Sequence, residues 1–123
     1  MPSGEIGLVG LGIMGKPMAR NLKVAGAEMI VHNRSQGVIE ELSSEGMTPA
    51  KTPADAAGAA ETVILMLSDT AAVEKVLWSA DGVVGGLKPG GLVIDMGTTK
   101  VIATRAFAKD VESAGGAYID APV

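Results

Sequence analysis

Three glycines near the N-terminus are the residues of this chain best suited to bind a ligand. They lie in a segment of the pattern G-x-G-x-x-G, whose residues are Gly10, Leu11, Gly12, Ile13, Met14 and Gly15. An apolar run precedes the segment, and a helical pattern over about residues 13–25 follows it. Between a strand and a helix, this pattern is typical of loops that bind the pyrophosphate of a dinucleotide.

Each glycine has its own expected role in such a loop. Gly10 permits a tight turn, Gly12 lets a pyrophosphate approach the backbone, and Gly15 lets the helix pack closely on the strand. The helix N-terminus then offers unpaired N–H groups to the phosphates. The alternative is a glycine-rich turn with a purely structural role. Because a strand precedes the loop, and a helix and a second strand follow it at the right distances, we expect all six loop residues to contact the cofactor.

A second group of candidate residues stands at the end of the next predicted strand, about 20 residues beyond the loop, where NAD-binding sites place Asp or Glu on the ribose. Here the chain has Asn33, Arg34 and Ser35. A carboxylate would repel the 2′-phosphate of NADP, whereas Arg34 can pair with it and its two neighbours can add hydrogen bonds. The alternative for Arg34 is a solvated surface charge. The three residues favour NADP as the cofactor.

The fourth and fifth predicted strands end in further candidate residues. Leu67 and Ser68 are expected to contact the cofactor, at the edge where a nicotinamide ribose lies in a doubly wound fold. Asp69 is interpreted as the cap of the next helix rather than as a catalytic group. Thr98 is a candidate both for a helix cap and for a contact with cofactor and substrate, and Thr99 is a candidate substrate contact.

The elements that must position these residues alternate along the whole chain. Apolar runs predict strands at residues 5–10, 28–33, 47–50, 62–67, 92–95 and 117–120, with helices between them. Right-handed crossovers then give an α/β fold of the Rossmann type, a doubly wound and mostly parallel sheet of order 3-2-1-4-5-6. Residues 1–123 are predicted to form one dinucleotide-binding domain.

Composition excludes several other classes of function. The chain has no cysteine and one histidine, so disulfides, thiol catalysis and metal sites of Cys or His are not expected. A net charge of −4 does not favour nucleic acid as a partner. The apolar runs are far shorter than the roughly 20 residues that cross a membrane, and the N-terminal residues lack a basic secretion signal. A cytoplasmic protein is expected.

Five segments carry a resemblance to a known family. GLGIMGKPMARNL, VHNRS, VILMLSD, LKPGGLVIDMGTT and YIDAPV resemble the 3-hydroxyisobutyrate dehydrogenases, also called β-hydroxyacid dehydrogenases, which are related to the NAD-binding domain of 6-phosphogluconate dehydrogenase. The resemblance covers essentially the whole chain. It implies the NADP-binding domain of an oxidoreductase that transfers a hydride between NADP(H) and a small 3-hydroxy acid or semialdehyde acid.

The sequence also departs from the family pattern. Gly97 stands where the D-x-S-T segment of the family has the serine that holds the substrate carboxylate. Family members continue after a segment like 121–123 with a catalytic lysine and a helical domain that makes most of the dimer contacts. The resemblance therefore implies a domain truncated before these parts, with no catalytic residue of its own and inactive alone. It also implies a homo-oligomer at full length, with the small-molecule substrate held largely by the missing part.

Two alternatives stay open at this point. The cofactor domain of an imine reductase has similar loops and a similar Asn-Arg pair. A cofactor-binding module without chemistry is the other alternative.

Overall fold

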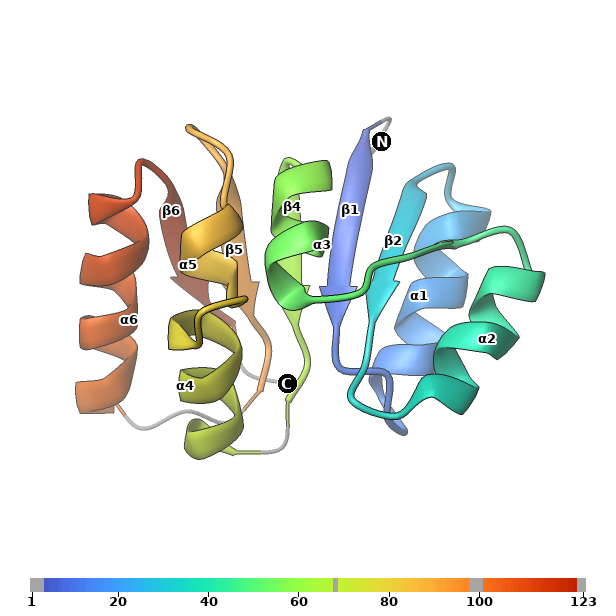
Figure 1. The fold of residues 1–123 in the computed structure, drawn as a ribbon, viewed down its shortest axis with the longest axis horizontal. Helices are drawn as coiled ribbons and strands as arrows, with labels where there is room; N and C mark the ends of the chain where they lie inside the picture. The colour runs from blue at the N-terminus through green and yellow to red at the C-terminus, as the bar shows by residue number, and fades with distance from the viewer. Residues whose placement is uncertain (1–3, 68, 98–100, 122–123) are drawn as a thin grey trace.

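The computed structural model describes residues 4–67, 69–97 and 101–121, which form one six-stranded sheet with helices on both faces (Figure 1). The strand order is β3-β2-β1-β4-β5-β6, and neighbouring strands pair in parallel. The predicted Rossmann-type fold and its strand order are therefore confirmed. Such a sheet brings the carboxyl ends of all its strands to one edge.

The strands and helices follow one another in strict alternation, apart from two successive helices before β5. The strands are β1 (Glu5–Val9), β2 (Glu28–His32), β3 (Thr48–Pro49), β4 (Thr62–Leu65), β5 (Leu92–Asp95) and β6 (Ala117–Asp120). The helices are α1 (Gly15–Val24), α2 (Gln36–Ser44), α3 (Pro53–Ala59), α4 (Thr70–Trp78), α5 (Val83–Gly86) and α6 (Val101–Ser113).

The observed bounds differ from the predicted ones mainly at the carboxyl edge of the sheet. β1, β2 and β4 end one or two residues earlier than predicted, and α1 begins at Gly15 rather than near residue 13. The chain turns at these positions: Gly10 has a φ of +103°, a left-handed conformation that interrupts a strand. β3 is a two-residue edge strand, and the single-turn helix α5 was not predicted.

Side-chain caps start two of the helices. The hydroxyl of Thr52 accepts a hydrogen bond from the N–H of Asp55 at 3.1 Å, and Pro53 occupies the first turn of α3. The carboxylate of Asp69 accepts from the N–H of Ala72 at 2.8 Å. Asp69 is thus a helix cap, as predicted.

Two apolar cores lie on opposite faces of the sheet. α1 and α2 cover one face, where Leu8 and Val31 are completely buried. α3 to α6 cover the other face, where Val63, Val93 and Phe107 are completely buried (Figure 1). Successive side chains of a strand point to opposite faces of the sheet, so the same strands supply both cores.

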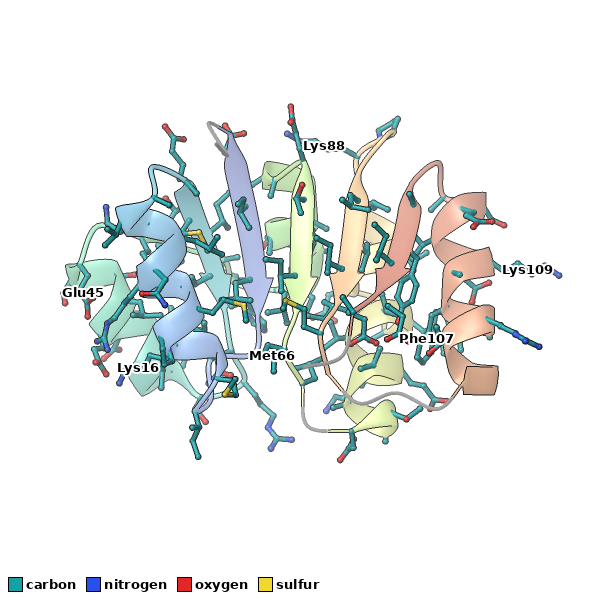
Figure 2. All side chains as sticks on the ribbon, turned by 180° about the vertical axis from the view of Figure 1, so that it is seen from behind. Lys16, Glu45, Met66, Lys88, Phe107 and Lys109 are labelled. Carbon is teal, nitrogen blue, oxygen red and sulfur yellow. The ribbon has the colours of Figure 1, made fainter. Side chains whose placement is uncertain are left out.

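One half of the sheet carries a helix on one face only. Figure 2 shows β4, β5 and β6 from the side of α1, where no helix of the described part of the chain lies over them. Parallel pairing aligns Ile64, Ile94 and Ile119 in one row across these strands. Ile64 is buried, whereas Ile119 at the edge is 49% exposed. This half of the face is therefore apolar and partly open.

In the part of the chain that the structure describes, no helix has the length and apolar character required to span a membrane. The same residues contain no group of three or more His, Asp or Glu side chains arranged to hold a metal ion.

Phe107→Ala tests the larger core. Phe107 is fully buried and packs between Trp78 and Tyr118, so its loss leaves a cavity that rigid neighbours fill only in part. We expect the free energy of unfolding to fall by about 3–5 kcal/mol in urea titrations followed by circular dichroism. Val24→Ala is the control, because Val24 is 89% exposed and its change should be within about 0.5 kcal/mol. Similar losses in both variants would contradict this account of the core.

Candidate cofactor site

Backbone crowding fixes the glycine loop between β1 and α1. A Cβ atom added to Gly10 would overlap the carbonyl oxygen of Met66, and one added to Gly15 would overlap the carbonyl oxygen of Gly10. Gly10 also needs its positive φ. The predicted tight turn at Gly10 and close helix packing at Gly15 are both confirmed. The loop is therefore held against the end of β4.

Gly12 is different, because nothing in the described protein requires a glycine there. A Cβ atom added to it would meet no atom within 4 Å, and its φ lies outside the left-handed region. The backbone N–H groups of Gly12, Ile13 and Met14 have no acceptor among the described residues. Free space and free donors just before a helix fit a bound pyrophosphate. The residues of this loop therefore fit the pyrophosphate of the predicted cofactor.

Asn33 braces the loop from the neighbouring strand. Its side-chain oxygen accepts a hydrogen bond from the N–H of Leu11 at 3.0 Å, and its amide nitrogen donates to the carbonyl of Ser35 at 3.4 Å. The side chain of Leu11 lies in the core beneath the loop. Sequence reasoning assigned Asn33 to the cofactor and missed this brace. The adjacency of β1 and β2 was the signal available, since both strands end at the same edge.

Arg34 and Ser35 lie exposed at the tip of β2. Among the described residues Arg34 forms no ion pair, whereas the nearby cations of α1 are engaged: Lys16 pairs with Glu41 at 2.8 Å, and Arg20 with the same carboxylate at 2.7 Å. These hydrogen bonds lower the pKa of Glu41, and the bond from Lys16 has the largest effect. Ser35 is the N-cap residue of α2 and makes no capping bond. Arg34 is thus an exposed cation without an ion pair among the described residues.

His32, one residue earlier, has a structural partner. Its Nδ1 lies 3.0 Å from the carbonyl oxygen of Ala50, so this ring nitrogen carries the proton and donates. The bond ties the end of β2 to the segment after β3. His32 is partly buried, and this contact gives it a structural role.

The carboxyl ends of β4 and β5 also meet through backbone. A Cβ atom added to Gly97 would overlap the carbonyl oxygen of Leu67, and Gly97 is buried. A serine, as in the family pattern, therefore has no room at this position unless the backbone moves. Of the predicted contacts here, Leu67 is half-buried at this junction, while Ser68, Thr98 and Thr99 lie outside the described residues.

A buried carboxylate lies beside that junction. Asp95 is completely buried at the end of β5, where its Oδ1 accepts from the N–H of Gly97 at 3.0 Å and its Oδ2 accepts from the hydroxyl of Tyr118 at 2.6 Å. Burial, and then this hydrogen bond, raise the pKa of Tyr118 above its ordinary value. Sequence reasoning named neither residue as functional. The signal was alternation in β6, which places Tyr118 on the face of Val93 and Asp95.

A family model described as the NAD binding domain of 6-phosphogluconate dehydrogenase matches residues 5–123. The chain belongs to this family.

Curated relatives of this NAD-binding domain are oxidoreductases. The 2-hydroxy-3-oxopropionate reductase of Escherichia coli (strain K12) is 38% identical over 97% of this chain and 40% of its own length. The mitochondrial 3-hydroxyisobutyrate dehydrogenase of Mus musculus is 36% identical over 96% of this chain and 35% of its own length. The chain thus spans roughly two fifths of the length of the curated relatives it matches.

Solved structures agree with this assignment. The 3-hydroxyisobutyrate dehydrogenase of Mycobacterium tuberculosis, solved with L-serine, matches with a TM-score of 0.88 and 29% identity, over 100% of this chain and 41% of that one. Psf3 in complex with NADP+ and 2-OPP matches with a TM-score of 0.89 and 27% identity, over 96% of this chain and 42% of that one. An imine reductase from Pseudomonas sp. matches with a TM-score of 0.80 and 30% identity, over 94% of this chain and 40% of that one.

These findings confirm the resemblance to the 3-hydroxyisobutyrate dehydrogenases. The chain is thus an NAD-binding domain of the 6-phosphogluconate dehydrogenase family, similar to the corresponding part of hydroxyacid dehydrogenases and reductases.

A groove of about 350 Å³ lies along the exposed side of α1 in this NAD-binding domain. It is lined by Met14, Pro17, Met18, Asn21 and Leu22. The groove runs along the helix rather than across the ends of the strands, and its lining is mostly apolar. It shares Met14 with the glycine loop.

Two valine substitutions separate ligand binding from folding in the loop. Gly12→Val should remove binding of both nicotinamide dinucleotides while the domain stays folded, because the side chain fills only the space in front of the loop. Gly15→Val should destabilise the domain, because its side chain enters the backbone of Gly10. Cofactor titrations by calorimetry and thermal unfolding by circular dichroism measure the two effects. Undiminished binding in Gly12→Val would remove the case for this loop.

Proposed function

We propose that this chain is the NADP(H)-binding domain of an oxidoreductase that transfers a hydride between NADP(H) and a small 3-hydroxy acid or semialdehyde acid. The observation that carries the proposal is the combination of open space and three free N–H groups at Gly12, Ile13 and Met14. When bound, the cofactor supplies or accepts the hydride at its nicotinamide. The residues of the domain hold and orient it.

The cofactor preference rests on the tip of β2. Arg34 is exposed and has no ion pair among the described residues, and Ser35 presents an uncommitted hydroxyl at the N-terminus of α2. Both features favour a phosphate on the ribose, since a guanidinium binds phosphate with paired hydrogen bonds. No acidic residue occupies positions 33–35, which removes the repulsion that an NAD-type carboxylate would exert. A neighbour solved with NADP+ supports the same choice.

The substrate class rests on the relatives. Those reported above act, by their names, on 2-hydroxy-3-oxopropionate and on 3-hydroxyisobutyrate, which are small hydroxy or oxo acids. With Gly97 in place of the family serine, the expected carboxylate site lacks one hydroxyl. The backbone of Leu67 leaves no space for a side chain at this position. We therefore propose that other groups hold the carboxylate in this enzyme, with Thr98 and Thr99 as the adjacent hydroxyl donors in sequence.

A second candidate is the cofactor domain of an imine reductase. It is favoured by the solved imine reductases among the neighbours, at 30% and 31% identity. The segment YIDAPV and the 3-hydroxyisobutyrate dehydrogenase neighbour, with its higher TM-score, favour the hydroxyacid enzymes.

Arg34→Ala tests the cofactor preference. The unmodified chain should bind NADPH more tightly than NADH, because only NADPH places a 2′-phosphate beside Arg34. The charge-assisted contact is worth about 1.5–3 kcal/mol, so the variant should lose about tenfold to hundredfold in NADPH affinity and almost nothing in NADH affinity. Lys109→Ala removes an exposed cation of α6 as the control. Equal affinities for the two cofactors in the unmodified chain would refute the assignment.

A substrate panel separates the two enzyme classes. We expect the full-length enzyme to reduce small semialdehyde acids with a kcat/KM at least about a hundred times that for cyclic imines, because a site shaped for one polar group leaves its own groups unpaired with the other. Steady-state assays that follow NADPH absorbance measure both. The reverse ranking would favour the imine reductase.

A further inference from the structure

All three aromatic side chains of this protein belong to one contact chain. The sequence has one tryptophan, one phenylalanine and one tyrosine. The rings of Trp78 and Phe107 meet edge to face with centroids 4.9 Å apart, and those of Phe107 and Tyr118 are 6.3 Å apart. The contacts join α4, α6 and β6 on the sheet face shown in Figure 1. Phe107, labelled in Figure 2, is their fully buried centre.

Tyr118, the last of the three rings, is hydrogen-bonded to a buried charge. Tyr118 donates its hydroxyl hydrogen to Oδ2 of Asp95 at 2.6 Å, while Oδ1 of Asp95 accepts from the N–H of Gly97 at 3.0 Å. The two carboxylate oxygens thus connect β6 to the backbone that leaves β5. Asp95 is the one charged side chain that is fully buried in the described part of the protein.

Gly97 in turn lies against the segment that follows β4. Its α-carbon lies so close to the carbonyl oxygen of Leu67 that no side chain fits between them. A shift of the Asp95 carboxylate would therefore move Gly97 and press on Leu67. Backbone contacts of this kind transmit displacement because packed interiors have little room to yield.

We propose that Tyr118 and Asp95 are positioning residues for the nicotinamide end of the cofactor site. The inference rests on the proposed NADP(H)-binding function, in which Leu67 lies at that end. Tyr118 acts through Asp95 and Gly97 and does not touch the cofactor. The glycine loop and Arg34, at the other end of the bound molecule, do not depend on this pair.

A role in positioning explains why a charge is buried here. Burial of a carboxylate among apolar side chains is costly, and an apolar pair of similar volume often supports a fold as well. A hydrogen-bonded carboxylate, by contrast, fixes directions, because each oxygen accepts from a specific donor. The directions fixed here are those of Tyr118 and of Gly97.

Tyr118→Phe tests the inference with two ligands. The variant keeps the ring and removes only the hydroxyl donor. NADPH spans the whole site, whereas 2′,5′-ADP carries only the adenosine half with its 2′-phosphate. We expect Kd for NADPH to rise about tenfold, the size of one hydrogen bond to a charged group, and Kd for 2′,5′-ADP to change by less than about twofold. Calorimetric titration measures both, and a merely structural role would not discriminate between them.

Two further variants complete the experiment. Asp95→Asn keeps an oxygen for the N–H of Gly97 but replaces the acceptor of Tyr118 by a donor, so it should show the same selective loss. Trp78→Phe alters the aromatic contacts and spares the hydroxyl, so both Kd values should stay unchanged.

The outcomes separate the inference from the function on which it rests. The inference alone would be overturned if the unmodified chain binds both ligands and Tyr118→Phe either keeps both affinities or loses them equally. An unmodified chain that binds neither ligand would overturn the proposed function, and the inference with it.

Discussion

The structure depends on the close approach of backbone segments at the carboxyl edge of the sheet. The loop after β1 touches the end of β4 at Gly10, and α1 touches the loop at Gly15, with no space for a Cβ atom at either contact. These contacts fix where α1 begins. The free N–H groups before the helix are consequently held in place before any ligand arrives, which spares the cost of ordering them on binding.

Two loops at this edge are also braced from a neighbouring strand. Asn33, just after β2, holds the N–H of Leu11 in the loop after β1. Tyr118 in β6 holds Asp95, which in turn holds the N–H of Gly97 after β5. The parallel order of the sheet makes this arrangement available, because neighbouring strands end side by side.

Much of this architecture was predictable from sequence because its signals are local. Strand order follows from the alternation of elements and from the handedness of crossovers, and Gly10 and Gly15 reveal themselves by their spacing. The braces were not predictable in the same way. That Asn33 gives its oxygen to Leu11, or that Gly97 lies against Leu67, depends on distances between loops that no residue pattern records. The early ends of β1 and β4 have the same origin, since the crowded loops begin there.

The two ends of the site consequently differ in how freely they can change. Arg34 is an exposed side chain, and the described residues around it do not need it for packing, so its replacement should have little effect on the fold. Under the proposed function, the same replacement changes the choice of cofactor. Gly97, Asp95 and Tyr118 are linked through buried backbone and a buried charge, so a change in one disturbs the others. Under the proposed function, a new specificity at the nicotinamide end therefore requires several coordinated substitutions, whereas one substitution suffices at the adenosine end.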